Sequence, residues 1–233
     1  MPSEFEQVVY VVDDDADVRE GIGALLESIG LEVVALSSTV EFLAQKRADR
    51  PSCLVLDVRL PGLSGLDFQA TVRTDIPIIF ITGHGDTSMA VRAMKAGAVD
   101  FLTKPLREQD VLDAVRIALD RDRERRRRKE RAVTLRSRFD LLSPREREVM
   151  TLLTTGMLNK QVGGELGISE ITVKAHRSKV MKKLNAKSFT DLVRMADALG
   201  LSRTINTDSP ESPNSSAPIP GSHAPMQKPP PLV

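Results

Sequence analysis

The chain has 233 residues, a formal net charge of +1, 41% apolar residues and only 3% aromatic residues. That apolar content is enough for packed cores, and the length favours two small domains filled mainly by Leu, Val, Ile and Met. One cysteine excludes an internal disulfide, and three scattered histidines give no zinc-site spacing. No run approaches the ~18 apolar residues of a membrane span and no signal peptide is recognisable, so we expect a soluble cytoplasmic protein.

The small net charge conceals an asymmetry along the chain. Residues 1–110 carry more acids than bases, whereas residues 121–187 are strongly basic. A local basic excess predicts a polyanionic partner, in this case for the second half only.

The first half alternates short apolar runs with stretches of helical spacing. We expect strands at residues 8–12, 31–36, 53–56, 76–81 and 99–102, and helices at 17–29, 39–48, 65–73, 87–96 and beyond 106. In the second of these helices, Val40, Phe42 and Leu43 are expected to face the sheet. Five strands alternating with five helices predict a doubly wound parallel sheet of about 120 residues.

Polar residues gather at the carboxyl ends of these strands. Asp13 and Asp14 end the first, Asp57 ends the third in LVLDVRLPG, and Thr82 and Lys104 follow the fourth and fifth. Each alone would be an ordinary loop residue, but parallel strands bring all five to one edge of the sheet, where ligands bind. Three crowded carboxylates repel unless a cation such as Mg²⁺ joins them, and a carboxylate so held is a competent nucleophile for a phosphoryl group.

These motifs resemble the receiver domain of bacterial response regulators. The resemblance rests on the acidic pair, LVLDVRLPGLSG around Asp57, FITGHGD with Thr82, and DFLTKP with Phe101 and Lys104. It implies that Asp57 accepts a phosphoryl group from a histidine of a partner kinase. It also implies that Thr82 and Lys104 contact that group and that Phe101 turns inward on activation, although Phe101 also fits as plain core filling.

The same resemblance implies a magnesium site. Asp14 and Asp57 would hold Mg²⁺ together with the main-chain carbonyl of Arg59, and Asp13 would act through bound water.

Residues 116–138 contain no Gly or Pro and are rich in Arg. Acid-to-base pairs four residues apart, Asp122 with Arg126 and Glu124 with Arg128, favour an exposed, solvated charged helix that continues the last receiver helix. A contact with DNA phosphates or a second subunit is the alternative. The apolar seam stops at Leu119, which argues against a long two-stranded coiled coil.

The second half is expected to be helical. Ser143, Pro144 and Glu146 form a helix start with a capping box, and Gly167 separates two later helices as in a helix-turn-helix at about residues 159–183. The second of those helices is basic on its polar face and has no acid after Glu170, which fits a phosphate-lined major groove.

The stretches LSPREREVM, NKQVGGELGIS and TVKAHRSKVMKKL closely resemble the LuxR-type DNA-binding domain. With the receiver, they point to the NarL/FixJ class of response regulators. Carried over by position, base edges are contacted by Lys174, Ala175 and Ser178, and phosphates by Lys160, Thr172 and Lys179. Beside these on the same helix, His176 is expected as a surface or phosphate contact and Arg177 as part of the basic face. Gly163 and Gly164 depart from the family pattern, since each costs roughly 1 kcal/mol in a helix.

We therefore expect five segments. They are an N-terminal arm (1–7), the receiver (8–120), a charged helical linker (121–138), the DNA-binding domain (139–203) and a disordered Pro/Ser-rich tail (204–233).

The expected function is a transcription regulator switched by phosphorylation of Asp57, with Mg²⁺ as cofactor and no enzymatic activity of its own. Its expected partners are a sensor histidine kinase, double-stranded promoter DNA, a second copy of the chain and RNA polymerase. Two alternatives stay open. One is a phosphatase working through an aspartyl-phosphate, although Arg59 stands where such enzymes usually carry a second acid. The other is a phosphorylation-independent DNA-binding protein whose receiver serves only as a dimer scaffold.

Overall fold

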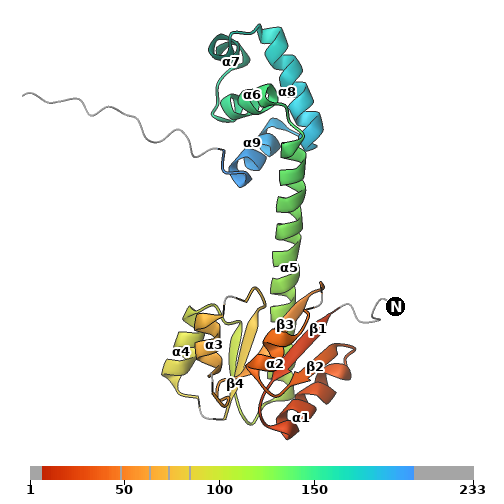
Figure 1. Ribbon diagram of the computed structural model, residues 1–233, viewed down its shortest axis with the longest axis vertical. Coiled ribbons are helices and arrows are strands. Elements are labelled where there is room, and N and C mark those ends of the chain that lie inside the picture. Colours follow the sequence, from red (N-terminus) through yellow and green to blue (C-terminus); the bar gives the residue numbers. More distant parts are fainter. Residues whose placement is uncertain (1–6, 48, 63, 73, 84, 202–233) are drawn as a thin grey trace, which may run out of the picture. The chain divides into compact units, whose positions relative to one another are not determined.

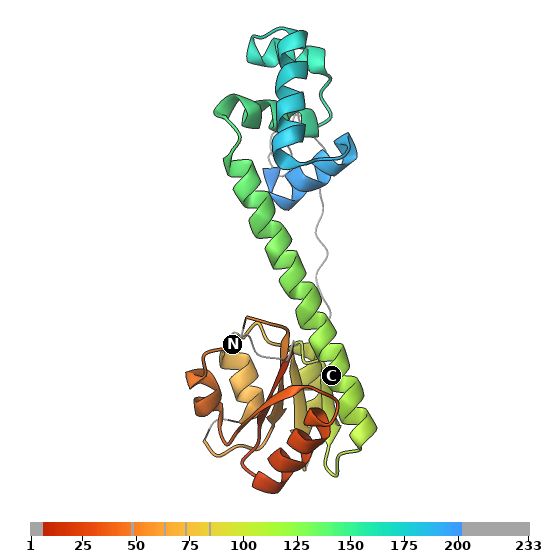
Figure 2. The same ribbon diagram turned by 90° about the vertical axis from the view of Figure 1, so that its right-hand side faces the viewer.

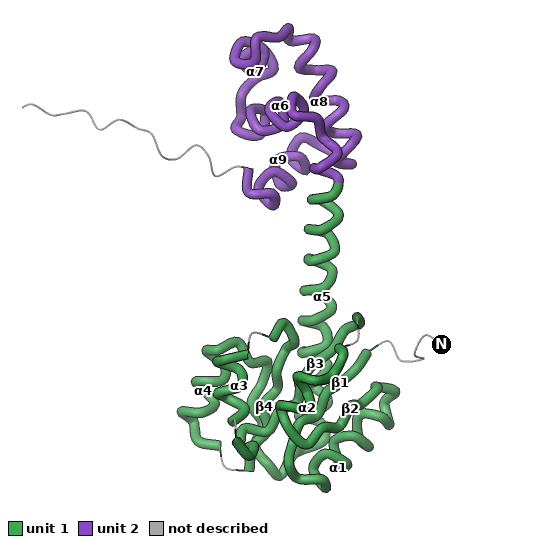
Figure 3. Tube along the Cα trace, viewed as in Figure 1, with its two compact units in different colours: residues 1–137 green, residues 138–233 purple. Residues whose placement is uncertain are grey.

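The computed structural model describes residues 7–47, 49–62, 64–72, 74–83 and 85–201. The chain divides into two compact units, residues 1–137 and 138–233 (Figure 3). Residues 1–6 of the expected arm and the whole expected tail lie outside the described residues.

The first unit is a five-stranded parallel sheet flanked by helices (Figure 1). Its strands are β1 (Val8–Val12), β2 (Glu32–Leu36), β3 (Ser52–Asp57), β4 (Ile78–Thr82) and β5 (Asp100–Thr103), in the order β2-β1-β3-β4-β5. Its helices are α1 (Ala16–Glu27), α2 (Thr39–Ala44), α3 (Gly65–Thr71), α4 (Thr87–Lys95) and α5 (Glu108–Asp140). The predicted doubly wound parallel fold is confirmed.

Each face of the sheet has its own core, because successive side chains of a strand point to opposite faces. Residues from α2, α3 and α4 pack on the face that receives Val8, Tyr10 and Val12 of β1. Residues from α1 and α5 pack on the face that receives Val9 and Val11. Figure 2 shows these helices on the two sides of the sheet. Both faces are covered, which explains why the strands are almost continuously apolar.

Helix α2 corrects one expectation. Phe42 is buried and its ring lies edge-on to Tyr10 and Phe68, with centroids 5.4 and 5.9 Å away. Val40 and Leu43, however, are exposed and do not face the sheet. Residues three positions apart lie on the same side of a helix, and in this six-residue helix the buried side is formed by Thr39 and Phe42. Val40 and Leu43 therefore lie on other sides of the helix.

Helix α5 runs without interruption through the Arg-rich stretch. Both expected acid-to-base pairs are present, since Arg126 contacts Asp122 at 2.7 Å and Arg128 contacts Glu124 at 3.0 Å. The helix is not solvated all round, because the Asp122 carboxylate is completely buried.

The buried Asp122 carboxylate joins α5 to the first residue of β3. One oxygen accepts the Ser52 N–H at 3.0 Å and the Arg126 Nε–H at 2.7 Å. The other accepts Arg125 through Nε at 2.8 Å and Nη2 at 2.6 Å. Four N–H groups thus satisfy a charge that would otherwise be costly to bury. We call Asp122, Arg125, Arg126 and Ser52 the Asp122 cluster.

The second unit is a small helical domain, as predicted. Its helices after α5 are α6 (Pro144–Thr154), α7 (Asn159–Leu166), α8 (Glu170–Leu184) and α9 (Phe189–Ala198). Ser143 and Glu146 form the predicted capping box at the start of α6, and Gly167 ends α7 in the left-handed conformation. No helix among the described residues has an apolar stretch long enough to cross a membrane.

Candidate functional site

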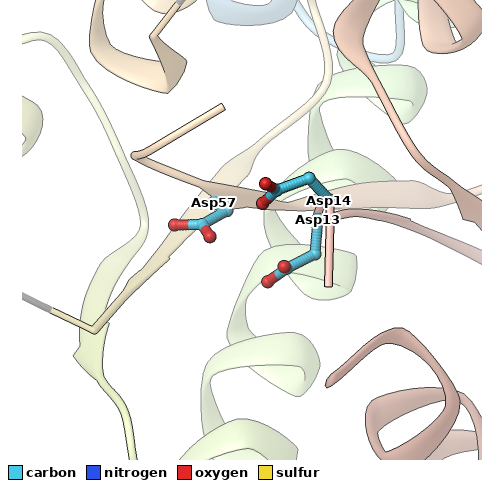
Figure 4. A group of neighbouring side chains, drawn as sticks. All are labelled: Asp13, Asp14 and Asp57. Carbon is cyan, nitrogen blue, oxygen red and sulfur yellow. The ribbon is translucent and has the colours of Figure 1, made fainter. Parts of the chain in front are cut away.

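Three carboxylates meet at the carboxyl edge of the sheet. Asp13 and Asp14 follow β1, Asp57 ends the neighbouring β3, and Figure 4 shows their side chains gathered there. An oxygen of each lies within 4.8 Å of the others, with Asp13 and Asp57 buried and Asp14 exposed. The arrangement follows from the parallel pairing of β1 with β3, which brings both strand ends to one place.

Lys104 contacts two of these carboxylates. Its Nζ lies 2.7 Å from an oxygen of Asp13 and 3.1 Å from an oxygen of Asp57. Burial opposes the charged ammonium, but the hydrogen bonds to both aspartates outweigh it and raise the pKa of Lys104 above its ordinary value. One positive charge is therefore fixed between the two buried acids.

The Asp13 carboxyl responds differently to the same surroundings. Burial raises its pKa above the ordinary value, and the hydrogen bonds from Lys104 and the Asp15 N–H offset this only in part. The nearby Asp57 charge adds to the rise. Since three acids face one ammonium, the site has an unbalanced negative charge that favours a bound cation.

The backbone after Asp57 also faces the carboxylate. The Arg59 N–H donates to an oxygen of Asp57 at 3.1 Å, while the Arg59 side chain is exposed. An open cleft of about 540 Å³, bordered by Asp14, Arg59, Met89 and Arg92, adjoins the acidic group. The cleft is also bordered by Val58, so it reaches Asp14 and the residue that follows Asp57.

Thr82 and Phe101 lie on the two neighbouring strands. Thr82 is completely buried at the end of β4, and its carbonyl accepts the Lys104 N–H at 2.8 Å. Phe101 in β5 is half-buried, with its ring centroid 6.4 Å from that of Phe80. The carboxyl edge thus holds the expected phosphoryl-contacting residues beside the acids.

Gly85 is a residue of this region that the sequence reasoning missed. A Cβ at this position would lie 2.7 Å from the Phe101 ring and 2.8 Å from the Thr82 methyl group. The glycine backbone therefore lies directly against both side chains. The only signal in the sequence is its place in FITGHGD, three residues after Thr82.

The outer face of α8 carries most of the residues expected to contact DNA. Val173, Val180 and Leu184 are buried and define the inner side of the helix. Of the residues expected to contact DNA, Lys174, Ala175, Ser178 and Lys179 are exposed on α8, and Lys160 is exposed on α7. Thr172 is half-buried, and its N–H is capped by the Ser169 hydroxyl at 3.1 Å.

His176 and Arg177 do not lie on that outer face. Both are half-buried, and the Arg177 guanidinium lies over the ring of Phe189 at 5.0 Å from its centroid. Their positions in the helix turn them toward the side of Val173 and Val180. Arg177 thus packs against α9 within its own unit.

Two families of known proteins match the two units. The response regulator receiver domain matches residues 9–116, and the luxR family of bacterial regulatory proteins matches residues 140–196.

Individual relatives match nearly the whole of this arrangement. Nodulation protein W of Bradyrhizobium diazoefficiens is 57% identical over 84% of this chain and 87% of its own length. The transcriptional regulatory protein FixJ of Azorhizobium caulinodans is 43% identical over 83% of this chain and 93% of its own. The solved structure of the response regulator StyR covers 82% of this chain and 98% of its own, with 47% identity and a TM-score of 0.71. This chain therefore belongs to the two-component response regulators, as a DNA-binding transcription regulator with a receiver domain and a LuxR-type domain.

Proposed function

We propose that Asp57 is the phosphoacceptor and that its phosphorylation by a sensor histidine kinase switches DNA binding by the second unit. The contact of Lys104 with both Asp57 and Asp13 carries this proposal. A phosphoryl group on Asp57 brings about two further negative charges into the site, where the Lys104 ammonium is already in place to receive them.

The donor set of the acidic edge fits Mg²⁺. Asp13, Asp14 and Asp57 offer oxygen ligands within 4.8 Å of one another, beside an open cleft that leaves room for water and phosphoryl oxygens. Asp14 and Asp57 with the Arg59 carbonyl would hold the ion, and Asp13 would act through water. When bound, the ion neutralises charge on the incoming phosphoryl group.

The switch involves Thr82, Phe101 and Lys104. The Thr82 hydroxyl moves to the phosphoryl group, and Phe101 turns into the space that it leaves. The packing of Gly85 against both side chains supports this, because a shift of either one affects the same backbone.

The receiver dimerises through the face formed by α4, β5 and α5. Val91 and Met94 on α4 and Ile117 on α5 expose apolar surface there. In this proposal the receiver spans residues 8–120, the linker 121–138 and the DNA-binding domain 139–203. Paired DNA-binding domains then dock on two half-sites of promoter DNA and recruit RNA polymerase.

On DNA, α8 lies in the major groove. Its exposed residues Lys174, Ala175 and Ser178 meet base edges, and Lys160, Thr172 and Lys179 meet phosphates. The packing of Arg177 on Phe189 favours a structural role for that residue.

Phosphoryl labelling tests the proposal. The full chain is incubated with Mg²⁺ and a small-molecule phosphodonor, and binding is measured on DNA selected by the chain from a random pool. Wild type should take up label and bind more tightly, whereas Asp57→Asn should do neither. Glu27→Gln, which alters an exposed acid at the end of α1 and outside the proposed dimer face, is the matched control and should behave as wild type.

The other outcomes separate the alternatives. Phosphoryl label that persists in Asp57→Asn would show that Asp57 is not the phosphoacceptor. DNA binding indifferent to labelling would favour a scaffold role for the receiver, and rapid turnover of unrelated phosphoesters would favour a phosphatase.

A further inference from the structure

The outer face of α8 has an exposed apolar residue near its N-terminal end. Ile171 is 79% exposed, although it is a large aliphatic side chain on a helix that buries Val173 and Val180. With 3.6 residues per turn, Ile171, Ala175 and Ser178 form one strip, nearly opposite the buried positions. The strip therefore points away from the core of the domain.

The local structure holds Ile171 in the first turn of the helix. Glu170 is the first helical residue, and the Ser169 hydroxyl caps the N–H of Thr172 at 3.1 Å. A β-branched side chain in a helix has essentially one χ1 rotamer, so Ile171 is presented in a fixed direction. Recognition helices contact base edges mainly through their N-terminal residues.

Ile171 is chemically unlike its neighbours on this face. Lys174 forms a 2.9 Å ion pair with Glu170 on one side of it, and Lys179 lies on the other. The Ile171 side chain can donate no hydrogen bond to a phosphate and accept none from a base. The feature of the major groove that matches an aliphatic side chain is the C5-methyl group of thymine.

We propose that Ile171 is a specificity-determining residue that packs on a thymine methyl group in each half-site. This rests on the proposed placement of α8 in the major groove. This contact gives the protein a preference for thymine at one base pair of each half-site, next to the base edges that Lys174 contacts.

Removal of single methyl groups from the DNA tests the assignment. The full chain, phosphorylated with Mg²⁺ and a phosphodonor, selects its site from a random pool, and each thymine of that site is then replaced by deoxyuridine. At one thymine of each half-site the replacement should weaken wild-type binding about fourfold, the value of one buried methyl group. Ile171→Ala should bind both DNAs equally at that position, and Ile171→Val should keep part of the preference.

Equal responses of wild type and Ile171→Ala to every replacement would overturn the proposal. So would an Ile171→Ala variant that weakens binding to all sequences alike, or one that changes only an interaction with another protein. An unchanged melting temperature of Ile171→Ala shows that any loss is not due to unfolding.

A parallel variant separates this inference from the placement of α8. If Lys174→Ala changes the selected sequence while the deoxyuridine responses stay equal, only the role of Ile171 is wrong. If neither Lys174→Ala nor Ile171→Ala changes the selected sequence, the placement of α8 is wrong as well.

Discussion

Two neighbouring glycines in α7 have opposite surroundings. A Cβ on Gly163 would lie 2.7 Å from the carbonyl oxygen of Ile168, whose N–H donates to Gly163 at 2.9 Å. A Cβ on Gly164 would meet nothing within 4 Å. The first glycine is therefore required by the tight approach of the turn to α7, and the second is not.

Alanine should accordingly act in opposite directions at these two sites. Gly164→Ala should raise the free energy of unfolding by about 0.5 to 1 kcal/mol, since it removes the helix penalty of glycine. Gly163→Ala should lower it by about 1 to 3 kcal/mol, because the Ile168 backbone must move. Urea unfolding of the full chain, monitored by a signal from the domain that contains α6–α9, measures both changes in the free energy of unfolding. A gain in stability for Gly163→Ala would contradict the packing argument.

Glu146 is a buried acid with a charged partner. It accepts Lys183 Nζ at 2.6 Å and the Ser143 N–H at 2.8 Å. Burial alone would raise its pKa, but these hydrogen bonds outweigh it and lower the pKa below the ordinary value of 4.5. The stabilisation is therefore complete above pH 4.5 and is lost as the pH falls through the lower folded-state pKa.

The Glu146→Gln variant should show this dependence. The amide oxygen can still accept the capping bond, so the expected loss, about 1 to 3 kcal/mol at pH 7, reflects the charged hydrogen bond to Lys183. The difference from wild type should shrink as the pH is lowered below about 4.5. Stability curves of both proteins between pH 3 and 7 measure it, and a constant difference would rule out the linkage.

The positions of the site residues could be predicted from the sequence where these residues directly follow a strand. Asp13, Asp57 and Lys104 follow strongly apolar runs, so the sequence alone placed them at one edge of the sheet, where the structure has them. The inward side of Arg177 and the tight contact of Gly163 depend on which helix packs against which. No local pattern encodes those contacts.

At the scale of elements, the Asp122 cluster joins α5 to the start of β3. The Asp122 carboxylate is completely buried, while Asp120, two residues earlier, pairs with Arg123 on the surface. The two acids have the same kind of partner but opposite environments. This difference makes them a matched pair for mutation.

Asp122→Asn should destabilise the receiver by about 1 to 3 kcal/mol, because the buried amide replaces one acceptor oxygen with a donor, while Arg125 and Arg126 keep their ion pairs with Asp75 and Asp49. Asp120→Asn should cost less than about 1 kcal/mol, as expected for an exposed ion pair. Chemical unfolding measures the loss, and hydrogen exchange should locate it at the start of β3 and the middle of α5. Equal effects of the two substitutions would contradict the cluster's role.

The start of α2 was predicted better than its end or its inward face. The periodicity began the helix at Thr39, as observed, but continued it to residue 48, whereas it ends at Ala44. It also assigned Val40 and Leu43 to the sheet face, although both are exposed and only Phe42 of the three is buried. In a helix of six residues, the pattern contains too few positions to define one face. The burial of Asp122 was equally invisible, since its acceptor role depends on Ser52, 70 residues away.

At the scale of the whole molecule, Mg²⁺ should act on one unit only. The three clustered carboxylates lie in the receiver, and no other group suited to hold a metal ion occurs among the described residues. At a hundredfold excess over its dissociation constant, the ion should stabilise the receiver by about 2.7 kcal/mol.

Hydrogen exchange with and without Mg²⁺ tests this. Amides of β1 and β3 should exchange more slowly with the ion, and amides of α6–α9 should be unaffected. Asp57→Asn should weaken the effect. Protection spread evenly over both units would mean that Mg²⁺ binds elsewhere.

The fold class and the two-part organisation were readable from alternating strands, helices and the shift in charge. The strand order β2-β1-β3-β4-β5 was not, because a single sequence carries no signal for which strands pair.

The Asp122 cluster finally sets a limit on how this regulator can be recombined. A hybrid that takes its DNA-binding domain from another protein must keep α5 at least through Arg126. A junction before Asp122 would deprive Ser52, at the start of β3, of its buried acceptor, at the opposite end of the strand from Asp57. The segment that can be exchanged for that of another regulator therefore begins after Arg126, inside the uninterrupted helix α5.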